Sequence, residues 1–247
     1  MKNSIKERRT VRKFSNKPVP ESLIHELLET AFRAPTMGNM QLYSVVITQD
    51  EAKKKDLATA HFNQPMVAEA PYLLTFCADF NRVTQWCDLR NAHAGYDNFQ
   101  SFLNAFSDAL LVLQTFTVLA EAEGLGTCYL GTALYNPEQI IEKLGLPTLV
   151  FPIAALSVGY PQEYPSQVER LPAAALIHKE TYQAYDAQRI EDIYKEKEAL
   201  EVNREFVRIN KVETLAQVFA DIRYKKTDNE YFSEKLLNVL KQQGFLK

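Results

Sequence analysis

The spacing of apolar residues predicts alternating helices and buried strands over the first 180 residues. Between Glu21 and Arg33, apolar side chains recur at helical intervals, which indicates an amphipathic helix that ends before Pro35. Runs rich in β-branched and aromatic residues indicate buried strands. These runs are Tyr43–Thr48, Tyr72–Ala78, 127–130 and 149–159, and a shorter strand is expected at 10–14. The pattern therefore favours a mixed helix-and-sheet domain.

A long helix is expected over 96–123. Its second half presents apolar residues almost all round its circumference, so it must be covered on all sides. This favours a central helix, or one whose covering is completed by a second subunit. The most apolar stretch, 109–122, is too short to span a bilayer.

The pattern changes near Lys179. From there to the C-terminus the chain shows no strand signal, dense charge and thin apolar stripes at helical spacing. We therefore predict a core over 1–179 and a helical extension over 180–247. The extension either packs on its own domain or wraps a partner subunit.

Composition narrows the class of protein. The 247 residues are 46% apolar, which excludes wholesale disorder, and carry a formal net charge of −3. An isoelectric point near 5.9 argues against a protein whose main task is to coat nucleic acid. The three cysteines, Cys77, Cys87 and Cys128, form no CxxC motif, so neither a disulfide scaffold nor a structural zinc site is expected. With no secretory signal visible, we expect a cytoplasmic protein.

Two segments carry candidate binding chemistry. In Arg8–Phe14 (RRTVRKF) several cations surround one hydroxyl, and on a strand Thr10 and Arg12 would point together. Converging arginine and hydroxyl donors suit a phosphate group, whereas the alternative is a solvated basic run. The segment 34–41 (APTMGNMQ) is a loop whose small polar groups suit the edge of a planar ring, or an ordinary helix-to-strand connection.

Two further segments stand out. The glycines of 123–132 (EGLGTCYLGT) do not form a dinucleotide-binding motif, because they follow a helix and precede a strand. Gly131, at the far end of that strand, would let a ligand approach the backbone closely. In 165–176, Arg170 lies just before a Leu-Pro turn.

The sequence shows no recognisable set of catalytic side chains. The sequence has no serine or cysteine nucleophile motif, no Walker loop and no cluster spaced as metal ligands. Scattered acids such as Asp108 are interpreted as surface or capping groups. A domain without an acid, base or nucleophile set favours a cofactor that brings its own chemistry.

These four segments, in this order, resemble the FMN-dependent nitroreductase superfamily. RRTVRKF, APTMGNMQ, EGLGTCYLG and VERLP look like its successive motifs. The C-terminal extension, with FNQPMV and FCADFNR, is most similar to the oxygen-insensitive nitroreductase and NADPH-flavin oxidoreductase branch. The resemblance implies an α+β fold, with a mixed, mainly antiparallel sheet flanked by helices and a helical C-terminal arm.

The resemblance also implies a homodimer with two FMN sites at the subunit interface. The phosphate and ribityl chain would be held by Arg8, Arg9, Thr10 and Arg12, with Arg170 at the phosphate. Gln64 would contact the ribityl chain or the polar edge of the ring. The ring would be lined by Tyr129, Leu130, Gly131 and Thr132, while the other subunit would supply Pro35, Thr36, Met37 and Asn39.

The implied activity is reduction of nitroaromatics, quinones or free flavins by NADPH or NADH, in a ping-pong mechanism without a catalytic side chain. Two alternatives are an FMN enzyme for another acceptor, such as an activated double bond or a halogenated compound, and a non-catalytic flavin-binding module. The chain departs from the family pattern at three positions: Val168 stands for a lysine, Glu169 for a proline, and Thr132 for a frequent glycine. No nucleic acid or membrane partner is expected.

Overall fold

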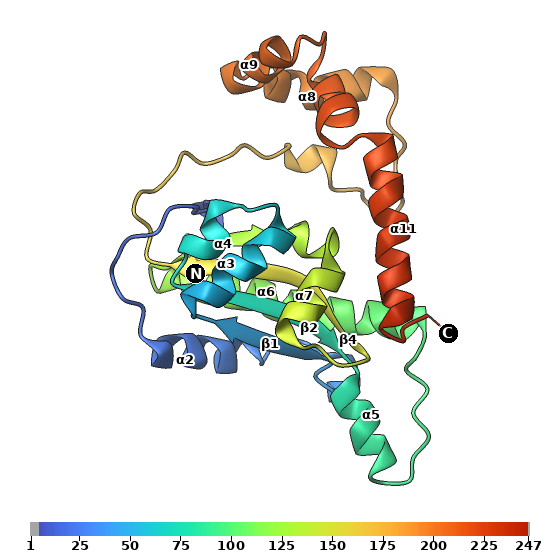
Figure 1. The fold of residues 1–247 in the computed structure, drawn as a ribbon. Coiled ribbons are helices and arrows are strands. Elements are labelled where there is room, and N and C mark those ends of the chain that lie inside the picture. The colour runs from blue at the N-terminus through green and yellow to red at the C-terminus, as the bar shows by residue number, and fades with distance from the viewer. Residues whose placement is uncertain (1–4, 247) are drawn as a thin grey trace. The chain divides into compact units, whose positions relative to one another are not determined.

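The fold is built on a four-stranded antiparallel sheet. The structure, a computed structural model, describes residues 5–246. The strands are β1 (Tyr43–Thr48), β2 (Tyr72–Asp79), β3 (Gly126–Leu130) and β4 (Val150–Gly159), in the order β1-β2-β4-β3. Every neighbouring pair is antiparallel, and the sheet lies between helices (Figure 1). The two central strands are buried along their whole length. Four of the expected strands are thus confirmed, as is the α+β fold class.

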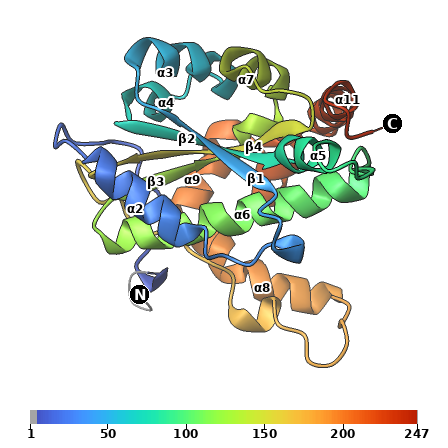
Figure 2. The same cartoon turned by 90° about the horizontal axis from the view of Figure 1, so that it is seen from below.

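Helices cover both faces of this sheet. On one side lie α2 (Glu21–Ala31) and α6 (Phe99–Ala122), which pack on each other and enclose the larger hydrophobic core (Figure 2). On the other side lie α3 (Glu51–Ala58), α4 (Pro65–Glu69) and α7 (Pro137–Leu144), over a smaller cluster. The sheet accordingly has two apolar faces, which explains why its central strands are continuous apolar runs.

Short elements connect these layers. They include the turns η1 (Met37–Asn39), η2 (Thr59–His61) and η3 (Gly131–Leu134) and the helix α5 (Asn81–Asp88). Neither α4 nor α5 was expected from the sequence, because each is only about one to two turns long.

The long helix α6 is only partly covered. Ten of its residues are buried, whereas Phe99, Leu103 and Leu111 are 44–47% exposed. These three share one face because they are spaced by four and eight residues. By length and composition alone, α6 is also long enough to cross a membrane. Its buried face, however, forms part of the main hydrophobic core.

The short strand expected at residues 10–14 is not formed. Instead, two isolated bridges tie this segment down, a parallel one from Thr10 to Thr127 and an antiparallel one from Phe14 to Pro161. A regular ladder cannot continue at Pro161, since proline has no N–H to donate.

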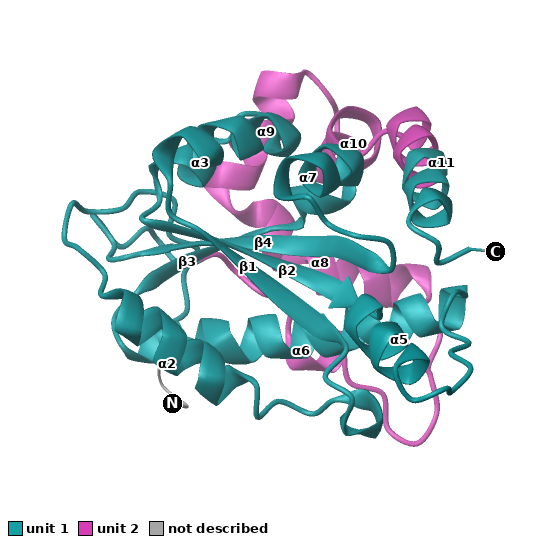
Figure 3. Ribbon diagram, turned by 60° about the horizontal axis from the view of Figure 1, so that its bottom comes forward, with its two compact units in different colours: residues 1–167, 234–247 teal, residues 168–233 magenta. Residues whose placement is uncertain are grey.

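The chain divides into two compact units, shown in Figure 3. The first holds the residues up to Gln167 together with those from Glu234 onward, and the second is Val168–Ser233. The predicted extension therefore falls into both units. Its last part belongs to the first, because Val239, Leu240 and Phe245 are buried in the main core.

The second unit is helical throughout its regular structure. It comprises η4 (Ala173–Ala175), α8 (Ala187–Ala199), α9 (Glu201–Asn210), α10 (Leu215–Gln217) and the π-turn η5 (Val218–Arg223), and α11 (Lys226–Gln242) begins within it. Only four of its residues are buried: Ala175, Asn203, Leu215 and Val218.

Candidate functional site

The basic N-terminal segment is fixed against the start of β3. The Val11 amide donates to the Thr127 carbonyl at 2.9 Å. Gly126 permits this approach, because a Cβ at that position would lie 2.7 Å from the Val11 side chain. The sequence Arg8–Arg12 therefore runs alongside the strand that leads to Gly131.

Arg8 points toward the end of α6. Its Nε lies 3.4 Å from Oε1 of Glu121, which also accepts a hydrogen bond from the Thr127 hydroxyl at 2.6 Å. Burial raises the pKa of Glu121, against the opposing effects of Thr127 and Arg8. Burial also raises the pKa of Cys128, and both Arg12 and Arg8 oppose it there. Arg8 and Arg12 thus place positive charge on the same part of β3.

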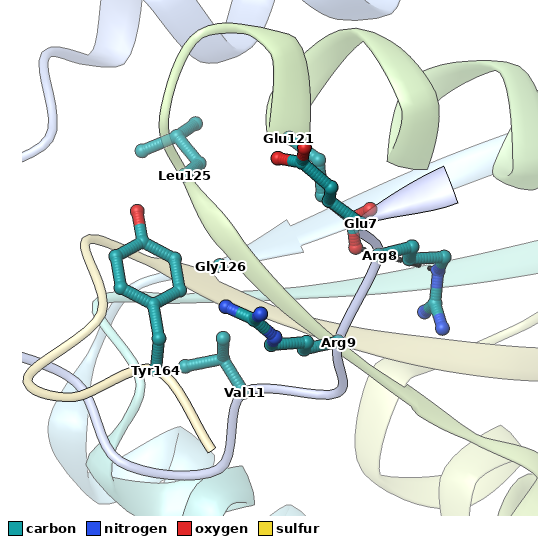
Figure 4. Close-up of a pocket in the computed structure, with 8 residues that line it drawn as sticks. All are labelled: Glu7, Arg8, Arg9, Val11, Glu121, Leu125, Gly126 and Tyr164. Carbon is teal, nitrogen blue, oxygen red and sulfur yellow. Dashed lines mark ion pairs between the residues drawn. The ribbon is translucent and has the colours of Figure 1, made fainter. Parts of the chain in front are cut away.

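Arg9 takes a different direction. Figure 4 shows its side chain pointing away from that of Arg8, although both line one pocket of about 320 Å³, together with Leu125 and Tyr164. Its Nε is buried and has no hydrogen-bond partner among the described residues. Thr10 and Arg12 do not line this pocket. The predicted phosphate-binding side chains therefore do not all converge within this unit: Arg9 is separated from Thr10 and Arg12.

The segment after β3 holds the predicted ring-lining residues. Tyr129 is 44% exposed, whereas Leu130 is buried in the smaller core, since neighbouring strand residues face opposite ways. A Cβ on Gly131 would lie 3.2 Å from the Tyr129 ring, which indicates how tightly the backbone turns there. Tyr129 and the backbone of Gly131, rather than the Leu130 side chain, are thus accessible.

Gln64 and Thr132 both contact His61, a residue that was not predicted to belong to the site. The Nδ1 atom of buried His61 lies 2.8 Å from the Thr132 hydroxyl. The backbone N–H of Gln64 donates to the His61 carbonyl at 3.2 Å. The Oε1 atom of its side chain is buried and has no hydrogen-bond partner among the described residues. A lone histidine has no sequence pattern that would have revealed this contact.

The Pro35–Asn39 loop is organised by Asp108 of α6. This buried carboxylate accepts hydrogen bonds from the Thr36 hydroxyl and from the Met37 amide, the latter at 3.0 Å. Asp108 therefore caps the η1 turn. Pro35, Met37 and Asn39 are exposed, and Asn39 has a φ of 56°.

This loop lies far from Arg8 within the protomer. Asp108 precedes Glu121 by thirteen residues on one continuous helix, a rise of about 20 Å. Because the loop is anchored at Asp108 and Arg8 at Glu121, the two predicted binding segments cannot contact one phosphate or one ring from the same protomer.

Arg170 belongs to the second unit, where an ion pair lies beside it. Its Nη1 atom donates to the Glu169 carbonyl at 2.9 Å. The Glu169 carboxylate pairs with Lys197 at 2.9 Å, and this contact is the main cause of the lowered pKa of Glu169. The negative charge at position 169 is therefore balanced by Lys197.

The sequence model of the nitroreductase family matches residues 5–160. The chain belongs to the nitroreductase family. An FMN reductase (NAD(P)H) of Bacillus subtilis strain 168 is 36% identical over 200 residues, which cover 76% of this chain and 80% of that protein.

Solved structures extend the nitroreductase likeness over the whole chain. A crystal structure from Bacteroides fragilis NCTC 9343 is 57% identical, with a TM-score of 0.98, and covers 99% of this chain and 100% of that one. NfrA2 of Bacillus megaterium is 31% identical, with a TM-score of 0.86, over 99% of this chain and 97% of its own. These matches confirm the nitroreductase fold expected from the four motifs.

Proposed function

We propose that this protein is an FMN-dependent oxidoreductase that uses NADPH or NADH to reduce nitroaromatics, quinones or free flavins by a ping-pong mechanism. The observation that carries the proposal is the clamping of the basic segment Arg8–Arg12 along β3. The strand delivers an accessible glycine and a half-exposed aromatic ring to the same place. The Bacillus relative named as an FMN reductase supports the choice of flavin.

Several unpaired groups fit this cofactor. Arg12 is exposed, and no ion-pair partner for it occurs among residues 5–246. Arg9 offers an unpaired donor, and Gln64 an unpaired acceptor. A flavin mononucleotide presents phosphate oxygens to such donors and ring N–H and C=O groups to an amide side chain.

The proposed roles follow the predicted set. Arg8, Thr10 and Arg12 bind the phosphate and ribityl chain, with Arg170 of the second unit at the phosphate. Arg9 belongs to the predicted set, but its side chain points away from that of Arg8, into a pocket that Thr10 and Arg12 do not line, and must turn to join them. Tyr129, Leu130, Gly131 and Thr132 line the ring, and Gln64 binds the ring edge or the ribityl chain. Bound FMN would supply the hydride chemistry. The chain's own part is to orient donor and acceptor on the ring and to stabilise negative charge with N–H groups and arginines.

The site is proposed to be completed in a homodimer. In one protomer the Pro35–Asn39 loop lies about 20 Å from Arg8 along α6, and a second copy is proposed to supply this loop to the flavin. The exposed face of α6, formed by Phe99, Leu103 and Leu111, supplies apolar surface for that contact. A cytoplasmic location is also part of the proposal, since Cys77, Cys87 and Cys128 are unpaired.

The decisive experiment is a visible spectrum of the purified protein, after incubation with FMN, before and after NADPH under nitrogen. We expect a yellow protein that NADPH bleaches and that a nitroaromatic or a quinone recolours. A yellow protein that neither NADPH nor NADH bleaches would reduce the proposal to flavin binding. A protein that takes up no FMN would overturn it.

A further inference from the structure

His61 ties together two segments that the proposed function places at the flavin. Its ring is fully buried, and its Nδ1 atom contacts Thr132, 71 residues further along the chain, at 2.8 Å. Its carbonyl accepts the Gln64 amide, and the neighbouring Ala60 carbonyl accepts Asn136 Nδ2 at 3.0 Å. The η2 turn is therefore attached to the η3 turn by side chains from both.

The backbone between His61 and Gln64 is strained. Phe62 and Asn63 have φ values of 55° and 53°, a left-handed conformation that residues other than glycine rarely adopt. Such a turn persists only when surrounding contacts determine it. The His61–Thr132 hydrogen bond is one of those contacts, so the position of Gln64 depends on it.

The hydrogen bonds around His61 indicate which ring nitrogen carries the proton. Burial lowers the pKa of His61 to about 4, so the ring is neutral near pH 7 and carries one N–H. Its Nε2 atom is buried and has no hydrogen-bond partner in the part of the chain that the structure describes. Since orphaned buried N–H donors are rare, the proton belongs on Nδ1, where it is donated to Thr132.

This assignment leaves the Thr132 hydroxyl proton available. Among residues 5–246, His61 is the one hydrogen-bond partner of this hydroxyl, and in this tautomer His61 donates to it and accepts nothing from it. The hydroxyl follows Gly131 directly, at the place where the ring is proposed to lie. A hydroxyl that donates a hydrogen bond to the ring edge would stabilise the negative charge that the ring gains on reduction.

We propose that His61 is a positioning residue: it holds the Thr132 side chain so that the Thr132 hydroxyl donates a hydrogen bond to the flavin and raises the reduction potential of the bound cofactor. This inference rests on the proposed function. It concerns a donor specific to this chain, because the family frequently has glycine at position 132.

The first test uses the protein without FMN. Nitrogen-15 NMR of histidine-labelled apoprotein at pH 7 distinguishes the two neutral tautomers, and His61→Leu identifies the His61 signals. We expect protonated Nδ1 in the wild type and a changed signal in Thr132→Val. A proton on Nε2 would overturn the inference whether or not flavin binds.

The second test measures the two-electron potential of bound FMN in matched variants. Thr132→Val should weaken the preference for reduced over oxidised FMN about threefold to tenfold, the value of one hydrogen bond. This corresponds to a potential about 15–30 mV lower, at about 30 mV per tenfold change. Thr132→Ser keeps the hydroxyl and should keep the wild-type potential.

The His61 variants separate positioning from general stability. His61→Leu should lower the potential as Thr132→Val does, and the double variant should show no further change. His61→Asn places an amide N–H near the Nδ1 position and should restore most of the potential. Wild-type potential in Thr132→Val, or additive shifts in the double variant, would overturn the inference while leaving FMN binding intact. If His61→Leu does not fold, the Thr132→Val and Thr132→Ser pair still tests the hydroxyl donor, and the His61 tautomer, with its signals identified by His61→Asn, tests the part played by His61.

Discussion

The two units of the chain are stabilised by different means. The first encloses the sheet between two apolar clusters, in which residues such as Phe76, Phe116 and Phe151 are wholly buried. The second buries four residues and relies on polar contacts, including the Lys197–Glu169 ion pair and a capping box at Thr214. A unit that buries so few residues gains much of its stability from packing against other protein surface. We therefore expect most substitutions in the second unit to cost little stability, except at polar contacts close to Arg170.

The largest expected effect tests this contrast directly. Phe116→Ala should destabilise the protein by about 3–5 kcal/mol, because it opens a cavity beside Phe76 in the main core. Phe219→Ala in the second unit should cost under about 1 kcal/mol, since Phe219 is 37% exposed. Urea unfolding of both variants measures the difference. Equal losses would show that the second unit has a core as demanding as the first.

The next effect concerns acid stability and the buried His61. The pKa of the His61 imidazole is about 6.5 in the unfolded chain, and burial lowers this pKa to about 4 in the folded protein. Between these values the unfolded state holds more protons, so stability decreases as the pH falls from 6.5 to 4. The loss attributable to His61 is up to about 3 kcal/mol.

The control for this prediction is His61→Asn, which does not titrate in that range. The free energy of unfolding of wild type and variant, measured at pH 7, 5.5 and 4.5, should converge as the pH falls. Parallel curves would contradict the buried, neutral state of His61.

A third effect compares two arginines of the first unit. Arg12→Ala removes a charged donor from the β3 segment and should weaken FMN binding about tenfold to hundredfold. Arg33→Ala removes an exposed cation that follows α2, outside the binding motifs, and should leave FMN binding unchanged. Flavin content after dialysis, with a binding titration for each variant, gives the comparison. Equal flavin retention would remove Arg12 from the site.

The sequence predicted the strands well where a run of apolar residues coincides with a strand of the sheet. The strands at Tyr43–Thr48 and 149–159 are mostly apolar runs, and the structure has them within one residue, although β1 is only half-buried between its end residues. The direction of Arg9 was not predictable, because the regular alternation assumed for 10–14 is replaced by two isolated bridges. His61 was missed as an organising residue, since it acts through one long-range side-chain contact with no local pattern. Asp108 was interpreted as a surface or capping group, and the structure shows it buried and capping the η1 turn through Thr36 and Met37.

A smaller effect tests the second unit near Arg170. Lys197→Ala leaves the Glu169 carboxylate unpaired beside Arg170 and should weaken FMN binding severalfold through charge repulsion. Adding Glu169→Gln removes that charge and should restore binding. A double variant no better than Lys197→Ala alone would show that Lys197 acts in some other way than by balancing Glu169.

The smallest expected effect concerns the choice between NADPH and NADH. Four cations of the second unit are candidates for reading the 2′-phosphate: Arg204, Arg208, Arg223 and Lys225. Arg208 is paired with Glu205, and Arg223 lies over the Phe206 ring at 4.3 Å. Arg204 has no ion-pair partner among the described residues and lines two pockets of this unit. We therefore expect Arg204→Ala to raise the KM for NADPH about threefold and to leave that for NADH unchanged, because a single exposed charge contributes under about 1 kcal/mol. Steady-state kinetics with both nicotinamides, and with Arg208→Ala as the matched control, measure it. An equal rise for NADPH and NADH would show that Arg204 does not read the phosphate, and the helical unit would then lose its one proposed part in nucleotide choice.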